Sequence, residues 1–278
     1  MFTFVWDIKC FEARGKADPN LKVIDVQAVA AEFVAMFMFV IIGCGVACGN
    51  GAFDGATRLM VAFAFGMAIM VLAYSIGHHS GGQINCAVTL SLVLGGKVSW
   101  YQGVANVLAQ LIGSVLGACF LWLLFPCDAD MTKSLGTNIV NRELYGHGRT
   151  LAGEIFGTFL LCYVVWETAV SKKFPTSNPN ACIAIGFAVF LAHLILLPID
   201  GCSINPTRSF GPAVVGALRN CVPETTAKGL EDLWIMWVGP MVGGALATFI
   251  QKPFFQQLPQ AQKIEDPIES IVPTAWQE

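Results

Sequence analysis

Six apolar segments, each long enough to cross a lipid bilayer and nearly free of charge, set the class of this chain. A helix needs about 20 apolar residues to span the hydrocarbon core of a membrane. The 278 residues are 55% hydrophobic and only 13% charged, which is more apolar than a soluble core requires. The sequence therefore predicts an all-α, multi-pass membrane protein, with spans near residues 26–48, 59–77, 103–125, 151–170, 181–197 and 233–250.

Two further apolar segments are too short to span a membrane. Residues 84–90 and 204–210 each carry an asparagine in second place, the residue type that caps helix N-termini. A helix of about ten residues rises only about 15 Å, half the apolar thickness. We expect two re-entrant half-helices that begin at Asn85 and Asn205 and meet tip to tip, with their positive dipole ends facing each other.

The two halves of the chain resemble each other. Residues 31–35, around Glu32, match residues 153–157, around Glu154, and residues 110–114 match residues 240–244. Each half holds three spans and one short segment, and an odd number of spans inverts the second half in the membrane. We expect an inverted repeat in one channel domain at residues 26–252, with repeats at 26–125 and 151–252. A cytoplasmic segment at 1–25 and a cytoplasmic, polar tail at 253–278 flank it.

Charge and cysteine content add less. Basic residues bias both termini toward the cytoplasm, and no cleavable signal is expected at the start of the chain. A net charge of −3 gives no indication of nucleic acid. Five of the ten cysteines fall inside the expected spans, where a thiol is usually a small buried apolar side chain: Cys44, Cys48, Cys119, Cys162 and Cys182. Cys127 and Cys221 lie in outward loops and could pair, but the sequence leaves this open.

The asparagine-led segments, with Glu32, Glu154 and the motifs Gly77-His78, Ser209–Ala213 and Trp237–Pro240, resemble the aquaporin (major intrinsic protein) family. The resemblance covers about residues 26–252. It implies a bundle of six helices and two half-helices, one pore per subunit and a homotetramer. Membership of the water-selective type is implied by the constriction residues below.

The family's Asn-Pro-Ala boxes are altered here. The first reads Asn85-Cys86-Ala87 and the second Asn205-Pro206-Thr207. Proline is favoured at the first position of a helix, so we expect Cys86 to loosen that cap and to add one N–H donor. Gln83 also stands where many relatives have a histidine. We expect a working pore with slightly altered geometry.

The resemblance implies a role for each pore residue. Asn85 and Asn205 would donate to a passing water and break the hydrogen-bonded wire that a proton needs, helped by the positive helix ends. Arg208, which costs about 3 kcal/mol inside a bilayer, needs a functional reason. By resemblance it forms the outer constriction with Phe65, His193 and Cys202. The two rings would narrow the passage to about one water, and His193 and Arg208 would present donors.

Other residues are given supporting roles. We expect Glu32 and Glu154 to accept hydrogen bonds from the re-entrant loops, with proton relay as the alternative. Cys202 at the constriction predicts sensitivity to mercurials. Ser99, after Lys97-Val98, is a possible regulatory site in a cytoplasmic loop.

These observations favour a passive water channel in a bilayer, most readily the plasma membrane, that excludes protons and ions. Glycerol conductors in the family carry a small residue in place of His193 and an aspartate in place of Ser209. The alternatives are a broader pore for hydrogen peroxide, ammonia or glycerol, and a structural membrane-junction protein. No HExxH, phosphate loop or CxxC pair points to an enzyme, and we expect neither metal nor cofactor.

Overall fold

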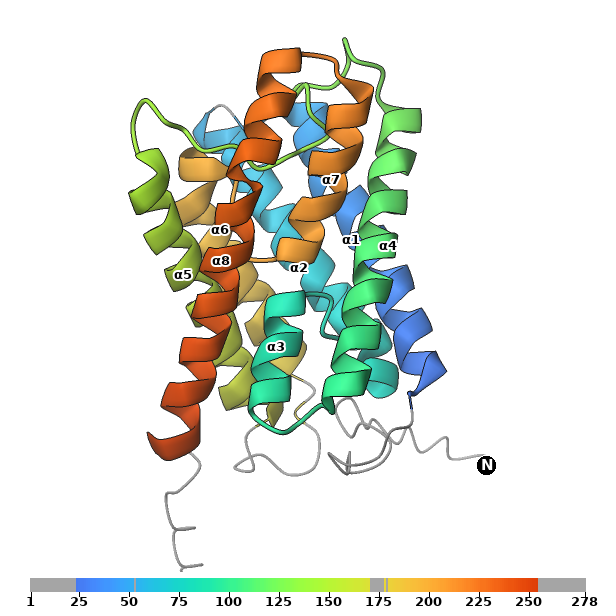
Figure 1. The fold of residues 1–278 in the computed structure, drawn as a ribbon, viewed down its shortest axis with the longest axis vertical. Coiled ribbons are helices and arrows are strands. Elements are labelled where there is room, and N and C mark those ends of the chain that lie inside the picture. Colours follow the sequence, from blue (N-terminus) through green and yellow to red (C-terminus); the bar gives the residue numbers. More distant parts are fainter. Residues whose placement is uncertain (1–23, 53, 171–177, 179, 255–278) are drawn as a thin grey trace, which may run out of the picture.

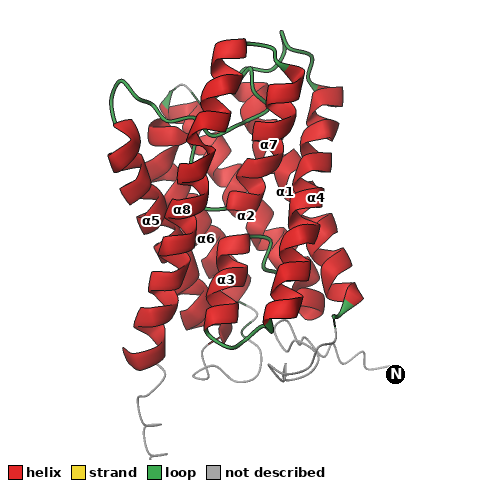
Figure 2. Ribbon diagram, viewed as in Figure 1, coloured by secondary structure: helices red, strands yellow, loops and turns green. Residues whose placement is uncertain are grey.

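The computed structural model describes residues 24–52, 54–170, 178 and 180–254, and this part of the chain consists of helices joined by loops (Figures 1 and 2). Six helices are long and apolar enough to cross a membrane, which confirms the predicted number of spans. The elements are α1 (Val26–Asn50), α2 (Gly55–Ser80), α3 (Cys86–Leu94), α4 (Trp100–Leu124), α5 (Gly146–Val165) with the π-helical turn η1 (Trp166–Val170), α6 (Ala181–Asp200), α7 (Pro206–Arg219) and α8 (Pro223–Phe254).

Helix boundaries follow local capping chemistry. The Asp25 carboxylate accepts the backbone N–H of Gln27 at 2.9 Å and so starts α1. Asp54 and Thr57 form a capping box at the start of α2. At their other ends, α2 and α6 stop at glycines in the left-handed region, Gly81 and Gly201, with φ of 85° and 83°. Both glycines lead directly into a re-entrant loop.

The half-helices lie in the middle of the bundle, between the spanning helices. Figure 1 shows α3 in the lower half and α7 in the upper half, with their N-terminal ends near mid-height. This arrangement confirms the predicted inverted repeat with two half-helices. The second half-helix is longer than expected, since α7 has 14 residues against 9 in α3.

Two boundaries differ from the predicted ones. Helix α8 begins at Pro223, ten residues before the expected span, because its first turns carry acidic and basic side chains and do not register as apolar. Helix α5 begins at Gly146, five residues before the expected start of its span at residue 151. The N-terminal segment up to residue 23 and the tail from residue 255 lie outside the described residues.

Glycines set the closest helix contacts. Helices α2 and α6 cross where Gly66 meets Gly186. A Cβ on Gly66 would lie 2.8 Å from the Gly186 carbonyl oxygen, and a Cβ on Gly186 would lie 2.7 Å from the Gly66 oxygen. Gly117 comes equally close to the backbone of α1 at Phe37. Small residues let helix backbones approach each other in membranes.

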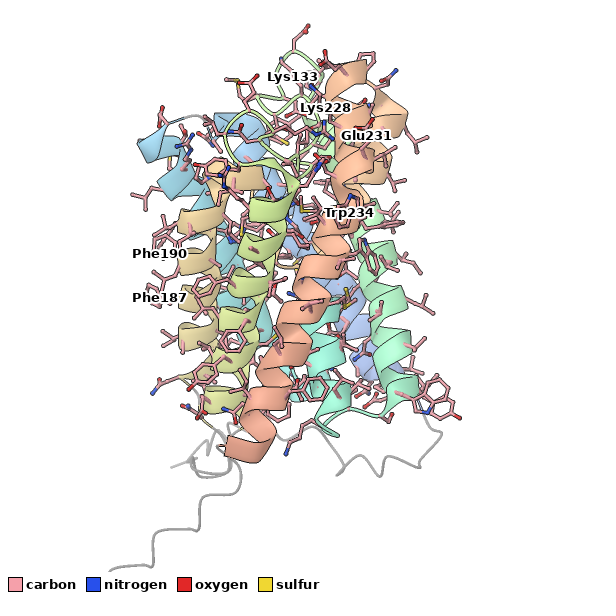
Figure 3. All side chains as sticks on the ribbon, turned by 60° about the vertical axis from the view of Figure 1, so that its left-hand side comes forward. Lys133, Phe187, Phe190, Lys228, Glu231 and Trp234 are labelled. Carbon is pink, nitrogen blue, oxygen red and sulfur yellow. A yellow bond between two sulfur atoms is a disulfide. The ribbon has the colours of Figure 1, made fainter. Side chains whose placement is uncertain are left out.

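The outer surface of the bundle is apolar. Leu123, Phe63 and Phe187 are among many exposed large hydrophobic side chains, with exposed fractions of 78%, 53% and 48%. Figure 3 shows such side chains pointing away from the helices around the bundle. A contiguous apolar belt of this kind is unstable in water and is suited to lipid.

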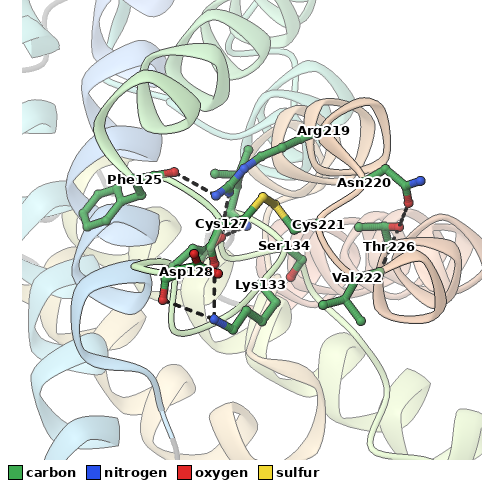
Figure 4. The surroundings of a disulfide bond; sticks show 12 residues. Phe125, Cys127, Asp128, Lys133, Ser134, Arg219, Asn220, Cys221, Val222 and Thr226 are labelled. Atoms are coloured by element: carbon green, nitrogen blue, oxygen red, sulfur yellow. Dashed lines mark hydrogen bonds and ion pairs between the residues drawn. A yellow bond between two sulfur atoms is a disulfide. The ribbon is translucent and has the colours of Figure 1, made fainter.

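A disulfide ties the loop after α4 to the segment after α7, at the end of the molecule opposite the start of α1 (Figures 1 and 4). Cys127 and Cys221, whose pairing the sequence left open, are bonded with their Cα atoms 5.6 Å apart. Beside them, the buried Arg219 donates to the Asp130 carboxylate at 2.9 Å and to the Phe125 carbonyl at 2.7 Å. The disulfide and ion pair together fix the loop that follows α4 onto the C-terminal end of α7.

Candidate functional site

The two half-helices meet at Asn85 and Asn205, both buried with only 2% of their surface exposed. Each side-chain oxygen caps its own helix: Asn85 Oδ1 accepts the Ala87 N–H at 2.8 Å, and Asn205 Oδ1 accepts the Arg208 N–H at 3.1 Å. Each NH₂ group donates one hydrogen across the junction, from Asn85 to the Ile204 carbonyl and from Asn205 to the Ile84 carbonyl. One N–H of each amide is left over for a solute.

The residues before the asparagines hold an unusual backbone. Ile84 and Ile204 have φ of 48° and 43°, a region that β-branched residues rarely enter. A buried acid holds each of them: Glu32 accepts the N–H of Ile84 at 2.7 Å, and Glu154 accepts that of Ile204 at 2.6 Å. The two carboxylates thus lie where the sequence analysis expected loop-supporting acids, and they fix the re-entrant loops in their strained conformation.

The altered boxes meet across the junction. The backbone N–H of Cys86, the donor that a proline would lack, points to the hydroxyl of Thr207 at 3.3 Å. That hydroxyl also contacts Asn205 Oδ1 at 2.8 Å and Gln110 Oε1 at 3.2 Å. The extra donor of the first box therefore finds its partner in the altered residue of the second box. Ala87, the third residue of the first box, packs with its carbonyl close to Gly244.

A cavity of about 270 Å³ leads to this junction from the loop between α3 and α4. It begins beside Lys97 and Val98, passes Asn85 and Asn205, and ends at His193. Both half-helix N-termini therefore face a continuous space, as a conduit requires. Its lining combines apolar residues such as Val88 and Leu161 with residues of the re-entrant loops such as Gly82 and Ser203.

Arg208 lies in the first turn of α7, is 2% exposed and is not among the residues that line this cavity. Its Nη1 donates to the Asn138 side-chain oxygen at 2.5 Å and to the Gly136 carbonyl at 3.1 Å. Its Nε has no hydrogen-bonding partner among the described residues. Neutral oxygens thus hold the guanidinium through Nη1, and the donors that these two bonds do not use, Nε–H among them, remain for a solute.

Phe65 and His193 lie against each other beside Arg208. Their rings stack with centroids 4.4 Å apart, and the Arg208 guanidinium carbon lies 4.8 Å from the centre of the Phe65 ring. Cys202, a buried free thiol, belongs to the loop before α7. The structure therefore brings Phe65 and His193 next to Arg208, and it carries Cys202 on the re-entrant loop that enters the same helix.

The hydrogen bonding of His193 corrects one expectation. Its Nδ1 lies 2.8 Å from the Val189 carbonyl, and because a carbonyl oxygen can only accept, Nδ1 must carry the proton. In the neutral ring Nε2 is then an acceptor, where the sequence analysis expected a donor. This Nε2 atom is buried without a partner among the described residues.

Other residues of the site were missed or placed differently. Asn138 and Gly136, which hold Arg208, lie in the outward loop that the sequence analysis treated only as a connection. That loop folds inward because the Ile139 N–H donates to the Asp200 carbonyl at 3.1 Å. Gln83 uses its amide within the protein, accepting from Thr89 at 2.7 Å. Ser99 is buried and caps α4 by accepting the Gln102 N–H.

Comparison with known proteins agrees with this geometry. The family model described as major intrinsic protein matches residues 21–251. Aquaporin-5 of Rattus norvegicus is 36% identical over 241 residues, covering 86% of this chain and 84% of its own. Aquaporin PIP2-7 of Arabidopsis thaliana is 37% identical over 229 residues, covering 80% and 78%.

A solved structure shares the fold at lower identity. The aquaglyceroporin from Plasmodium falciparum superposes with a TM-score of 0.70 at 17% identity, covering 89% of this chain and 99% of its own. At that identity the likeness shows the architecture alone. Six spans, two half-helices capped by paired asparagines, and relatives that match over most of their length lead to one conclusion: the chain belongs to the major intrinsic protein family, the aquaporins, and is a membrane channel.

Proposed function

We propose that this channel conducts water in single file and passively, down osmotic gradients, while it excludes protons, ions and larger neutral solutes. The observation that carries the proposal is the constriction built from Phe65, His193 and Arg208. The rings of Phe65 and His193 and the guanidinium of Arg208 occupy the section of the path that follows the cavity. We infer that these three bulky side chains narrow the path too far for a carbon backbone such as that of glycerol.

Polar atoms at the constriction suit water in particular. His193 Nε2 accepts and Arg208 Nε donates, and both are buried without a partner among the described residues. A water molecule that passes would replace part of its hydrogen-bond shell with these two groups, whereas an ion would find too few ligands to replace its own. Ser209, which follows the arginine, carries no carboxylate. Its hydroxyl donates to the Asn138 side-chain oxygen at 2.8 Å.

Proton exclusion is assigned to the junction of the half-helices. The free N–H of Asn85 and that of Asn205 both donate, so a water bound there accepts from them and turns its own hydrogens away. The N-terminal ends of α3 and α7 add positive potential at the same depth. A chain of waters oriented in opposite directions on the two sides cannot relay a proton.

The membrane context is part of the proposal. Basic residues near the ends of the chain support cytoplasmic termini. The disulfide lies at the opposite end of the molecule, which supports an outer face in an oxidising compartment, as at the plasma membrane. The domain limits at 26–252 and a homotetramer with one pore per subunit follow from the family resemblance.

Stopped-flow light scattering on proteoliposomes tests the proposal. Vesicles with the channel should shrink much faster than protein-free vesicles after a sucrose jump. After glycerol or urea jumps of equal osmolarity they should shrink to the same extent and should not re-swell faster than the protein-free control, because these solutes do not enter. Fast re-swelling in glycerol would support the broader pore instead. No gain in permeability, with clustering of vesicles through the outward loops, would support a junction protein.

A further inference from the structure

Asp200 is a buried acid that the conduction path described above does not use. It is the last residue of α6 and 2% exposed, five residues before Asn205. Ser80 holds the matching place in the first half, as the last residue of α2, five residues before Asn85. The glycine after each has nearly the same backbone, with φ 83° and ψ 6° at Gly201 and φ 85° and ψ 6° at Gly81.

Ser80 shows what this position does in the first half. Its hydroxyl donates to the Glu32 carboxylate at 2.5 Å and accepts the N–H of Gly82, two residues on, at 3.1 Å. One small side chain thereby links the buried acid of α1 to the start of the re-entrant loop. The donor is the hydroxyl proton, since both oxygens of Glu32 act as acceptors for loop amides as well.

Asp200 repeats this pattern with a carboxyl group. Its Oδ1 accepts the N–H of Cys202, again two residues on, at 2.8 Å. Its Oδ2 is buried and meets no group among the described residues that could donate to it. The neighbour within hydrogen-bonding contact is the carboxyl of Glu154, the counterpart of Glu32. Two carboxylates would repel each other there, whereas a carboxylic acid and a carboxylate bond strongly.

The position of the shared proton follows from the partners of Glu154. Its two oxygens accept the N–H groups of Ser203 at 2.8 Å and Ile204 at 2.6 Å, so Glu154 is the acceptor. Arg208 of α7 is the charged group nearby that balances one negative charge, and the Cys202 thiol of the loop is the other titratable neighbour. We propose that Asp200 is a neutral carboxylic acid that donates its proton to Glu154 and so positions the constriction loop at Cys202.

Asp200 is thus a positioning residue that acts through the loop and touches no solute in the path. Its proton does in the second half what the Ser80 hydroxyl does in the first half. Without the proton, one oxygen of each acid would face the other with no hydrogen between them, and the link between Asp200 at the start of the loop and Glu154 of α5 would be lost. The second half therefore has a bond between two acids beside the constriction, where the first half has a bond between a serine and an acid.

Infrared spectroscopy of the purified full-length channel in lipid tests the protonation directly. We expect a carbonyl stretch of a protonated carboxylic acid that shifts in heavy water and is lost in Asp200→Asn. Asp130→Asn is the matched control, because Asp130 is a buried acid paired with Arg219 and should leave the band unchanged. A band that survives in Asp200→Asn, or no such band in the unaltered channel at neutral pH, overturns the proposal.

A series of substitutions tests the positioning role. Asp200→Asn and Asp200→Ser keep a donor toward Glu154, whereas Asp200→Ala leaves a buried oxygen unpaired and should lower the population of the intact loop by about tenfold or more. We expect the thermal midpoint and the water permeability to fall in the alanine variant and to be restored by asparagine or serine. Equal loss in all three overturns the positioning role. The infrared and thermal measurements need no water flow, so their failure is distinct from failure of the proposed conduction.

Discussion

Asn85 and Asn205 each donate to the backbone of the opposite half: Asn85 Nδ2 lies 2.8 Å from the Ile204 carbonyl, and Asn205 Nδ2 lies 2.7 Å from the Ile84 carbonyl. Because the acceptor in each bond is the residue just before the other asparagine, the two bonds form a reciprocal clamp. The clamp orients both amides, so that each keeps its second N–H free. Neither asparagine is therefore only a helix cap.

We predict that Asn205→Ala lowers stability and raises proton leakage. The substitution removes the cap on the Arg208 N–H, worth about 1 kcal/mol, and leaves the buried Ile84 carbonyl unpaired, which costs about 1–3 kcal/mol. Thermal unfolding in detergent measures the first effect, and a pH-sensitive dye inside proteoliposomes under a membrane potential measures the second. Asn106→Ala is the control, since Asn106 is a buried amide bonded to Gln83 and Gln102 near the start of α4. Equal leakage in both variants would contradict the assigned role.

Arg208→Ala should admit larger neutral solutes or ions. The side chain that lies over Phe65 is removed, and Asn138 and the Gly136 carbonyl are left without their cation. Glycerol and urea re-swelling rates should rise above those of the unaltered channel. Arg219→Ala is the matched control: it removes another buried arginine, from the ion pair with Asp130, and should reduce stability without changing selectivity. Unchanged exclusion of glycerol in Arg208→Ala would place the filter elsewhere.

Cys202→Ser should abolish block by mercurials while water flow continues. The Cys202 thiol is a free cysteine in the loop beside the constriction, so a bound mercury atom would obstruct the path or displace that loop. Water permeability with and without the mercurial measures the effect. Cys119→Ser serves as the control, because Cys119 is exposed on α4 and should leave the block intact. Persistent block in Cys202→Ser would move the sensitive site to another thiol.

The Asp130–Arg219 pair predicts how stability depends on pH at the outer face. Burial raises the pKa of the Asp130 carboxyl, but hydrogen bonds from Thr132, Leu135 and Arg219 outweigh it and hold the pKa below its ordinary value of 3.8. A lowered folded pKa stabilises the protein above 3.8, and this contribution is lost as the pH falls through the folded value. Asp130→Asn should therefore unfold at a lower temperature than the unaltered channel at neutral pH.

The difference between these two proteins should shrink in strong acid, where the unaltered Asp130 is also protonated. Thermal unfolding across an acidic pH series measures it. A gap that stays constant down to the lowest pH would show that Asp130 stabilises the loop by packing and not by its charge.

The fold could be predicted from the sequence because each of its elements has a local signal. Spans show as apolar runs, the half-helices as asparagine caps on runs too short to cross, and the inversion as a repeat with an odd number of spans. The start of α8 was missed, since Glu224 and Asp232 interrupt the apolar pattern although the helix continues through them.

The site was only partly readable, because several of its bonds join residues far apart in the chain. Asn138 meets Arg208 across 70 positions, through an outward loop whose inward turn depends on a carbonyl at the end of α6. The contact of Cys86 with Thr207 spans 121 positions. The sequence showed both boxes to be altered, but only the tertiary contact shows that one alteration supplies the partner for the other.

The crossing of α2 and α6 at Gly66 and Gly186 limits which residues these two positions can hold. Gly66 is the immediate neighbour of Phe65, and Gly186 is two helical turns from His193, so the two helices that bear the filter rings are pressed together at these glycines. A single methyl at either position would act as a wedge and spread the rings. The distance between α2 and α6, and with it the width of the pore at the two rings, therefore depends on two glycines that no permeating molecule contacts.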